Sequence, residues 1–385
     1  MPSKQNVQTD DDRLNWRYQD KAYNEMFKAW RRQRKDSIGF YYVSKPNELT
    51  YLDGYGFVTD YPEAAERNAL RRVMNVIGVT MMILGIIDLL YKYAVPNLLS
   101  AFGADIYFDK YTKTFYGNEW LILGIDAFFS IIKRLIPLLY VYKKMQMPVK
   151  VMIPTRITNR TLFRYSVPVM LFAAGCCTAA SGVYDRILRF CGISKDELFE
   201  MPDSKAVLVL YLIVHIILIP VISEIHTRGA MLQLLRQFGD GFAIVVTALL
   251  TAFVTYNMST FCYVFVTSLV IGYFTVRTGS VVTAIIMRMT SAAFSYGLFM
   301  TGELASEKNG GLIVMIVMLA VLAVGLVSFI KLLINDSNSF SLNFKKRYLS
   351  FSDKCGIAVS SIPFVVGFTI IIIHTIINVN FVMTI

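Results

Sequence analysis

The sequence predicts an all-α membrane protein, and three observations support this fold class. Apolar residues make up 55% of the chain and charged residues only 17%, and the mean hydropathy is +0.51. Several apolar runs are close to the length that a helix needs to cross the hydrocarbon core of a bilayer. We therefore expect a polytopic helical bundle of about eight or nine spans, with a cytoplasmic segment at its N-terminus.

The first residues lack the basic and then apolar order of a secretory signal, because Met1 to Asp12 is polar and acidic. An apolar stripe at helical spacing follows over residues 14–30 and ends in the basic run 31–35. This pattern predicts an amphipathic helix that lies either on an anionic leaflet or on the cytosolic face of the protein itself. The aromatic, Gly-punctuated stretch 39–62 predicts a short hairpin or an ordered loop.

Nine spans are expected after this segment. They cover residues 73–95, 119–142, 166–187, 205–227, 242–256, 259–276, 281–300, 312–335 and 357–384. The fifth is about 15 residues long, which is too short for a full crossing at about 1.5 Å per residue, so it is a half-helix or it lines a cavity. We divide the chain into an N-terminal segment (1–70), a first group of membrane helices (71–200), a core (201–302) and C-terminal membrane helices (303–385).

The net charge of +11 is also found in nucleic-acid-binding proteins, but here the basic residues cluster beside the spans. With the N-terminus in the cytoplasm, the inside connections hold Lys143, Lys144, Lys150, Arg156, Arg160, Arg164, Arg228, Arg236, Arg277, Lys345, Lys346, Arg347 and Lys354. The outside connections hold only Lys110, Lys113, Arg189, Lys195 and Lys308. This bias predicts a cytoplasmic N-terminus in a cell membrane, with membrane lipid and no nucleic acid as a partner.

Neither a metal site nor a cofactor is expected. The five cysteines are odd in number and show no CxxC spacing, so they indicate neither a disulfide framework nor a thiolate site. The sequence has no GxGxxG, P-loop or HExxH pattern.

Eight charged residues interrupt the expected spans: Asp88, Asp126, Lys133, Arg134, Asp185, Arg186, Arg288 and Lys331. Those near the span ends, such as Arg186, Lys331 and Asp88, are expected to reach the interface. Arg288 lies in the middle of a span, so it should face the bundle interior and pair with an acid. Asp126 and Arg134, two turns apart, are a candidate second pair.

A carboxylate stands near the end of the fourth span, where Glu224 is followed by His226, Arg228 and Gly229. Charge at this depth is costly, so an intramembrane Glu indicates either a functional site or a structural ion pair. Arg228 follows Glu224 by four residues, on the same helical face, and is its expected partner.

The stretch from Ile219 to Met300 resembles the CAAX prenyl protease and bacteriocin-processing family of glutamic-type intramembrane endopeptidases. The family's Glu-Glu-x-x-x-Arg motif and following Gly align with residues 223–229, Ser-Glu-Ile-His-Thr-Arg-Gly. Its Phe-x-x-x-His motif aligns with Phe253 to Asn257, and its His-x-x-x-Asn motif with Arg288 to Ala292. Between them, Gly272 to Ser280 reproduces the family's Gly-rich span that ends in Arg-Thr-Gly-Ser.

The resemblance implies that the first Glu and the second-motif His of the family activate a water for attack on a peptide bond. In this sequence, four of the family's motif residues are replaced, by Ser223, Asn257, Arg288 and Ala292. Glu224, Arg228 and Gly229 match the family's motif. Ser and Asn do not act as general bases at neutral pH, and a guanidinium does not deprotonate. His226, His215 and His374 are expected off the face of Glu224, as core or interfacial residues.

We therefore predict a degenerate family member in which Glu224, Arg228 and Arg288 form a buried ion cluster. The preferred function is a pseudoprotease that binds a transmembrane or lipidated peptide in an immunity, maturation or scaffold role. One alternative is an active endopeptidase in which Glu224 is the catalytic base, assisted by Arg228. A second alternative is a transporter-like protein, because of the charged residues in its spans.

Overall fold

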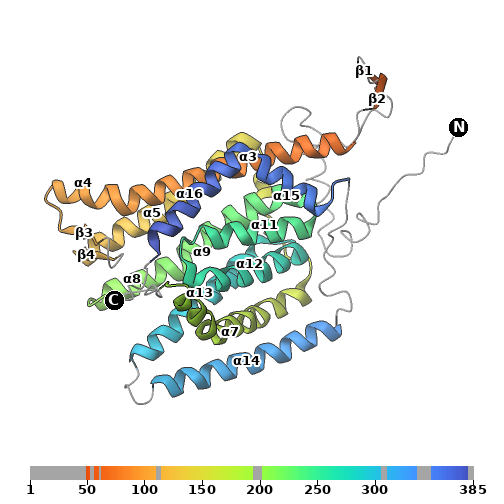
Figure 1. Ribbon diagram of the computed structural model, residues 1–385. Coiled ribbons are helices and arrows are strands. Elements are labelled where there is room, and N and C mark those ends of the chain that lie inside the picture. Colours follow the sequence, from red (N-terminus) through yellow and green to blue (C-terminus); the bar gives the residue numbers. More distant parts are fainter. Residues whose placement is uncertain are drawn as a thin grey trace.

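The structure is a computed structural model that describes residues 49–52, 56–59, 62–109, 114–193, 202–304, 310–335 and 348–379. The predicted amphipathic helix at residues 14–35 lies outside these ranges. Strands β1 (Leu49–Leu52) and β2 (Gly56–Thr59) pair antiparallel, which confirms the hairpin expected in this part of the chain. The remainder is a bundle of long helices (Figure 1), which confirms the predicted all-α class.

The first long helix is continuous from α3 (Pro62–Leu89) through the π-helical turn η1 (Leu90–Ala94) into α4 (Val95–Ala101). A small hairpin of β3 (Ile106–Phe108) and β4 (Phe115–Gly117) leads to α5 (Glu119–Met145). The Asn118 side chain caps α5 by accepting hydrogen bonds from the backbone N–H groups of Trp120 and Leu121. The short α6 (Val149–Met152) precedes α7 (Arg160–Phe190).

The fourth span is one helix of 32 residues, Lys205–Arg236. It consists of α8 (Lys205–Ile213), η2 (Val214–Leu218), α9 (Ile219–Glu224), η3 (Ile225–Met231) and α10 (Leu232–Arg236). The helices α11 (Asp240–Phe253), α12 (Met258–Thr278), α13 (Val281–Leu304) and α14 (Gly310–Asn335) follow. The predicted short fifth span corresponds to α11, which has only 14 residues, and its place in the membrane stays a prediction.

The last predicted span, 357–384, is not one straight helix. The structure has α15 (Phe351–Ser360) and α16 (Ile362–Asn378), which meet at an angle of 80°. Pro363 has no backbone N–H and therefore cannot continue the hydrogen bonds of α15, and the Ser361 side chain caps the new helix.

Six helices of the described chain are long and apolar enough to cross a membrane, or seven if the bent pair α15 and α16 is one span. Helix α5 has sufficient length with 27 residues, but Asp126, Lys133 and Arg134 interrupt its apolar run. A total of eight or nine spans requires that α5 and α11 are counted as well, and this total stays a prediction.

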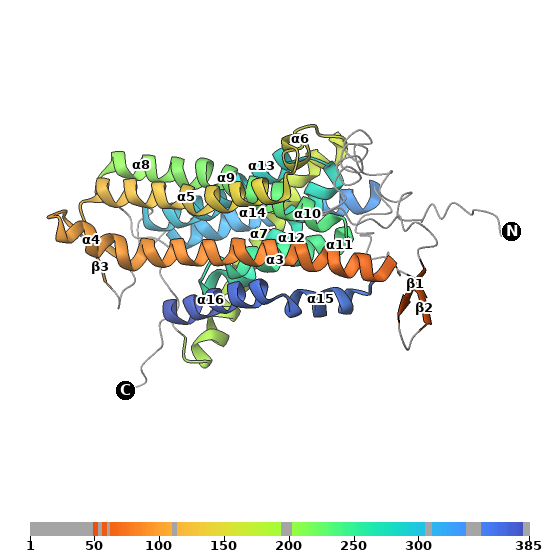
Figure 2. The same cartoon turned by 90° about the horizontal axis from the view of Figure 1, so that it is seen from above.

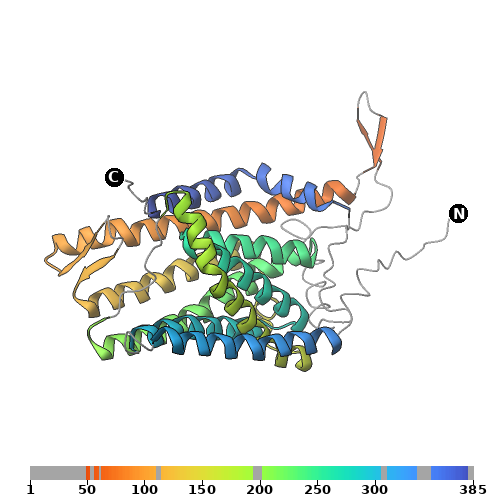
Figure 3. The same cartoon turned by 60° about the horizontal axis from the view of Figure 1, so that its bottom comes forward.

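In Figures 1 and 3, helices α3 and α16 lie on one side of the bundle and α14 on the opposite side, with α11 and α12 between them. One apolar core joins α3, α5, α10, α11 and α16, and a second joins α7, α12, α13 and α14. At the contact of α3 with α16, a Cβ atom on Gly78 would overlap the backbone of Phe364, so the close approach of these helices requires glycine.

The loops that were predicted to be cytoplasmic meet at one end of the bundle (Figure 2). The Thr158 amide donates to the Thr278 carbonyl at 3.1 Å, and the Val281 amide donates to the Pro154 carbonyl at 2.9 Å. Lys354 of α15 donates to the Phe238 carbonyl after α10. These contacts join the segment before α7 to the turn after α12, and α15 to the turn after α10.

Candidate functional site

Each of the three π-helical turns carries intramembrane polar side chains. Turn η1 contains Tyr91 and Lys92, η2 contains His215, and η3 contains His226 and Arg228. A π-helical turn inside an α-helix rotates the residues that follow and often marks a functional site. The third turn begins directly after Glu224 and therefore changes which face its residues share.

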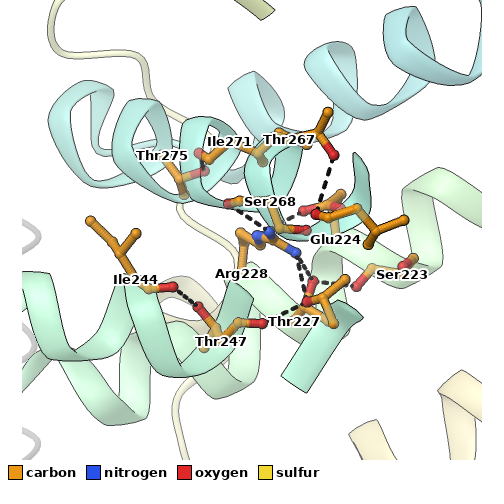
Figure 4. A network of polar contacts seen from close by, with 12 residues as sticks. Ser223, Glu224, Thr227, Arg228, Ile244, Thr247, Thr267, Ser268, Ile271 and Thr275 are labelled. Atoms are coloured by element: carbon orange, nitrogen blue, oxygen red, sulfur yellow. Dashed lines mark hydrogen bonds and ion pairs between the residues drawn. The ribbon is translucent and has the colours of Figure 1, made fainter. Parts of the chain in front are cut away.

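Glu224 and Arg228 form a buried ion pair on the side of the long helix that faces α12 (Figure 4). Their side chains are 1% and 0% exposed, and Arg228 Nε lies 3.2 Å from Glu224 Oε2. The guanidinium also donates to the Thr227 hydroxyl at 2.9 Å and to the Ser268 carbonyl of α12 at 3.0 Å. The predicted pairing of these two residues is therefore present, and it holds the carboxylate inside the helix packing.

A cavity of about 200 Å³ lies on another side of the same helix. It is lined by Met81, Leu84, Lys133, Arg134, Ser223, His226, Thr227, Met231, Leu250, Thr251, Val254, Thr255 and Arg288. These residues come from α3, α5, α9, η3, the C-terminal end of α11 with the residues after it, and α13. Ser223, His226 and Thr227 have the i, i+3, i+4 spacing of one helical face, and Glu224 does not line the cavity.

The cavity is cationic. Lys133 and Arg134 of α5 and Arg288 of α13 line it, and no described acidic residue does. Its threonine hydroxyls donate to carbonyls of their own chain segments, for example Thr251 to the Thr247 carbonyl at 2.7 Å. His226 is 2% exposed, and its Nε2 has no hydrogen-bond partner among the described residues.

The four residues that differ from the family's motifs, Ser223, Asn257, Arg288 and Ala292, do not all lie at the cavity. Ser223 and Arg288 line the cavity, whereas the Asn257 side chain caps α12 by accepting from the Thr260 amide at 3.2 Å. Ala292 does not line the cavity. The predicted cluster of Glu224, Arg228 and Arg288 is therefore formed only in part.

Arg288 does not make the acid pair expected for it. Within the described part of the chain, no carboxylate lies within 4.0 Å of its guanidinium, although Glu224 is close enough for a longer Coulomb interaction. The physical reason is that Glu224 already pairs with Arg228 on the face away from the cavity.

A second polar cluster joins α3, α5 and α16. Asp88 is 2% exposed and lies 2.6 Å from Lys133, 3.6 Å from Lys92 and 3.3 Å from His374. The prediction that Asp88 reaches the interface is therefore wrong, because Lys92 of its own helix and Lys133 of α5 neutralise it inside the bundle, where His374 of α16 also lies against it.

The predicted pair of Asp126 and Arg134 is also wrong. Asp126 accepts from the Tyr91 hydroxyl at 3.0 Å and lies 3.2 Å from His215 Nε2. Arg134 donates instead to the Ser130 carbonyl of its own helix, one turn earlier, at 2.9 Å. The two side chains face different neighbours, although they lie on one helix.

The residues Arg277 to Ser280 join helices and make no contact with the cavity. Gly279 has φ +69°, which favours glycine, and it ends α12. The Ser280 hydroxyl donates to the Thr155 carbonyl at 3.1 Å. Within the described ranges, no group of three or more His, Cys, Asp or Glu side chains is arranged to hold a metal ion.

The long apolar helices of the described chain define a multi-pass integral membrane protein. Residues 205–294 match the family model described as Type II CAAX prenyl endopeptidase Rce1-like. The match begins at α8 and ends within α13, so it contains Glu224, Arg228 and all the former motif positions. No curated protein and no solved structure matches the chain in the comparisons.

Proposed function

We propose that the protein is a non-catalytic relative of the CAAX proteases that binds a transmembrane or lipidated peptide at the former cleavage site. It would act by holding this peptide, as an immunity protein, a maturation partner or a scaffold does. We further propose that it resides in the cell membrane with its N-terminus in the cytoplasm, in line with the basic loops at one end of the bundle.

One observation carries the proposal: the only carboxylate left from the first motif is held away from the cavity. Glu224 faces Arg228 at 3.2 Å and is 1% exposed. A general base must reach the water from which it takes a proton. Ser223, at the position of the family's first Glu, does face the cavity, but a neutral hydroxyl is no base at neutral pH.

The second motif supports the same conclusion. Asn257 has its side-chain oxygen engaged with the Thr260 amide at the start of α12, and it does not line the cavity. His226 does line it, but no carboxylate lines the cavity to orient this imidazole. The water-activating pair of the family therefore has no substitute there.

The test separates binding from cleavage. Purified protein in detergent is incubated with farnesylated and acylated peptides that carry a photo-crosslinker, and both crosslinked and cut products are measured by mass spectrometry. We expect crosslinks to η3 and α13 and intact peptides for the wild type. Cleavage by the wild type that is lost in Glu224→Gln, with the variant shown by circular dichroism to remain folded, would instead establish the alternative, an active endopeptidase.

A transporter-like role is the second candidate, and the cluster around Asp88 favours it. Buried acids and histidines that connect several helices also occur in proton and ion pathways. The cluster joins Asp88 to Lys133 and His374. Asp126, also on α5, pairs with His215 of η2. Proton flux into liposomes that requires Asp88 would support this role, and the absence of flux would exclude it.

A further inference from the structure

Within the described part of the chain, no carboxylate lies within 4.0 Å of either arginine that lines the cavity. Among these residues, Arg134 donates only to the Ser130 carbonyl, and Arg288 makes no hydrogen bond or ion pair. The two guanidiniums are close enough to repel each other. Lys133 adds a third cation at the cavity wall, although Asp88 pairs with it at 2.6 Å.

Two neighbouring cations without a counter-charge are unfavourable inside a membrane protein, because a charged residue there normally pairs with a residue of the opposite charge. Glu224 does not neutralise them, because Arg228 is its direct partner. The cavity therefore has the charge of an anion site, with about 200 Å³ of space between the cations.

The free hydrogen-bonding groups also fit an anion. Thr227, Thr251 and Thr255 use their hydroxyl hydrogens on backbone carbonyls, so these residues offer no donor to a ligand. The donors that remain among the lining residues belong to the two guanidiniums, the Ser223 hydroxyl, the His226 ring and the part of the Lys133 ammonium that Asp88 does not use. A ligand that only accepts hydrogen bonds and carries about two negative charges matches this set, and a phosphate group has both properties.

We propose that this cavity binds a phosphate group between Arg134 and Arg288. Arg288 is seven residues after the first residue of α13, or about 10 Å along the helix from its end. That depth can be reached by the phosphate of a lipid in the adjacent leaflet, and inorganic phosphate is the other possible source. The proposal goes beyond the peptide-binding role and stands or fails separately from it.

The test uses delipidated, full-length protein in an uncharged detergent. Melting temperature and native mass spectrometry are recorded with phosphatidic acid, inorganic phosphate, diacylglycerol and an acylated peptide with a free carboxylate. We expect stabilisation by phosphatidic acid and none by diacylglycerol. Stabilisation by inorganic phosphate to the same extent would identify free phosphate as the source and would also support the site.

Two variants test the residues. Arg134→Met and Arg288→Met should each weaken binding of phosphatidic acid about 10- to 100-fold, because each removes a charge-assisted contact. Arg186→Met removes an exposed arginine of α7 that does not line the cavity and should leave binding unchanged.

Arg288→Lys retains the charge and should bind better than Arg288→Met, which separates loss of binding from loss of folding. Equal binding by the wild type and both methionine variants would overturn the proposal. Tighter binding of the peptide carboxylate than of phosphatidic acid would overturn it as well.

Discussion

Two faces of the long helix Lys205–Arg236 differ in whether the charges beside them are neutralised. On one face, Glu224 and Arg228 are fully buried and neutralise each other. On the other, Ser223 and His226 border a cavity whose cations, Arg134 and Arg288, have no acidic partner. We infer from this difference that the buried pair stabilises the fold, and it is the basis for proposing the cavity as a ligand site.

The largest effect is expected from breaking the buried pair. Glu224→Ala leaves the Arg228 guanidinium buried without a counter-charge, which typically costs about 3 to 5 kcal/mol. We expect a large drop in the melting temperature of the purified protein in detergent. Arg186→Met, at an exposed position, is the control and should change stability by less than about 0.5 kcal/mol. Equal melting of both variants would contradict a structural role of the pair.

The comparison extends to Asp88, which is also buried and paired. Asp88→Asn removes the negative charge that Lys133, Lys92 and His374 share. We expect a loss of about 3 kcal/mol, because the cations then remain buried without compensation. Thermal unfolding measures this loss, and Asp105→Asn, at an exposed position between α4 and β3, provides a matched control. A smaller loss for Asp88→Asn than for the control would indicate that the cluster does not contribute to stability.

A moderate effect is expected at Asn257, whose side chain caps α12. Asn257→Ala removes the cap of α12 and should cost about 1 kcal/mol. Asn257→Ser keeps a capping oxygen and should restore most of the stability. Unfolding of the two variants in detergent tests this assignment. If both variants matched the wild type, the cap would not be needed.

The smallest effect on stability is expected at Arg288. Arg288→Met removes one of two repelling cations and breaks no ion pair within 4.0 Å in the described part of the chain. Without ligand, the free energy of unfolding of Arg288→Met should therefore lie within about 0.5 kcal/mol of the wild-type value or above it. A drop as large as that of Glu224→Ala would show that Arg288 belongs to the buried pair after all.

Much of the fold was predictable from the sequence because apolar length is a local property. The long apolar runs gave the helices, and the four-residue spacing of Glu224 and Arg228 gave their ion pair. The motif order also located the segment that matches the family model. Each of these signals lies within one stretch of chain.

The partners of the other charged residues depend on which helices are neighbours. Lys133 and Arg134 are adjacent in sequence, yet one binds Asp88 of α3 and the other faces Arg288 across the cavity. Spacing on one helix suggested Asp126 as the partner of Arg134, whereas His215 of another helix lies closer to that acid. His226 does lie off the face of Glu224, as its spacing predicts, but the cavity that it borders is formed by several helices and could not be read from one stretch of chain.

The central claim is that the protein has no group able to take a proton from a water at the former cleavage site. The most direct measurement is incorporation of oxygen from H2¹⁸O into peptide carboxylates, because any hydrolysis leaves this label. Purified protein and a mixed set of lipidated peptides should give no label above a heat-inactivated sample. Label that appears with the wild type and disappears with Glu224→Gln would contradict the account.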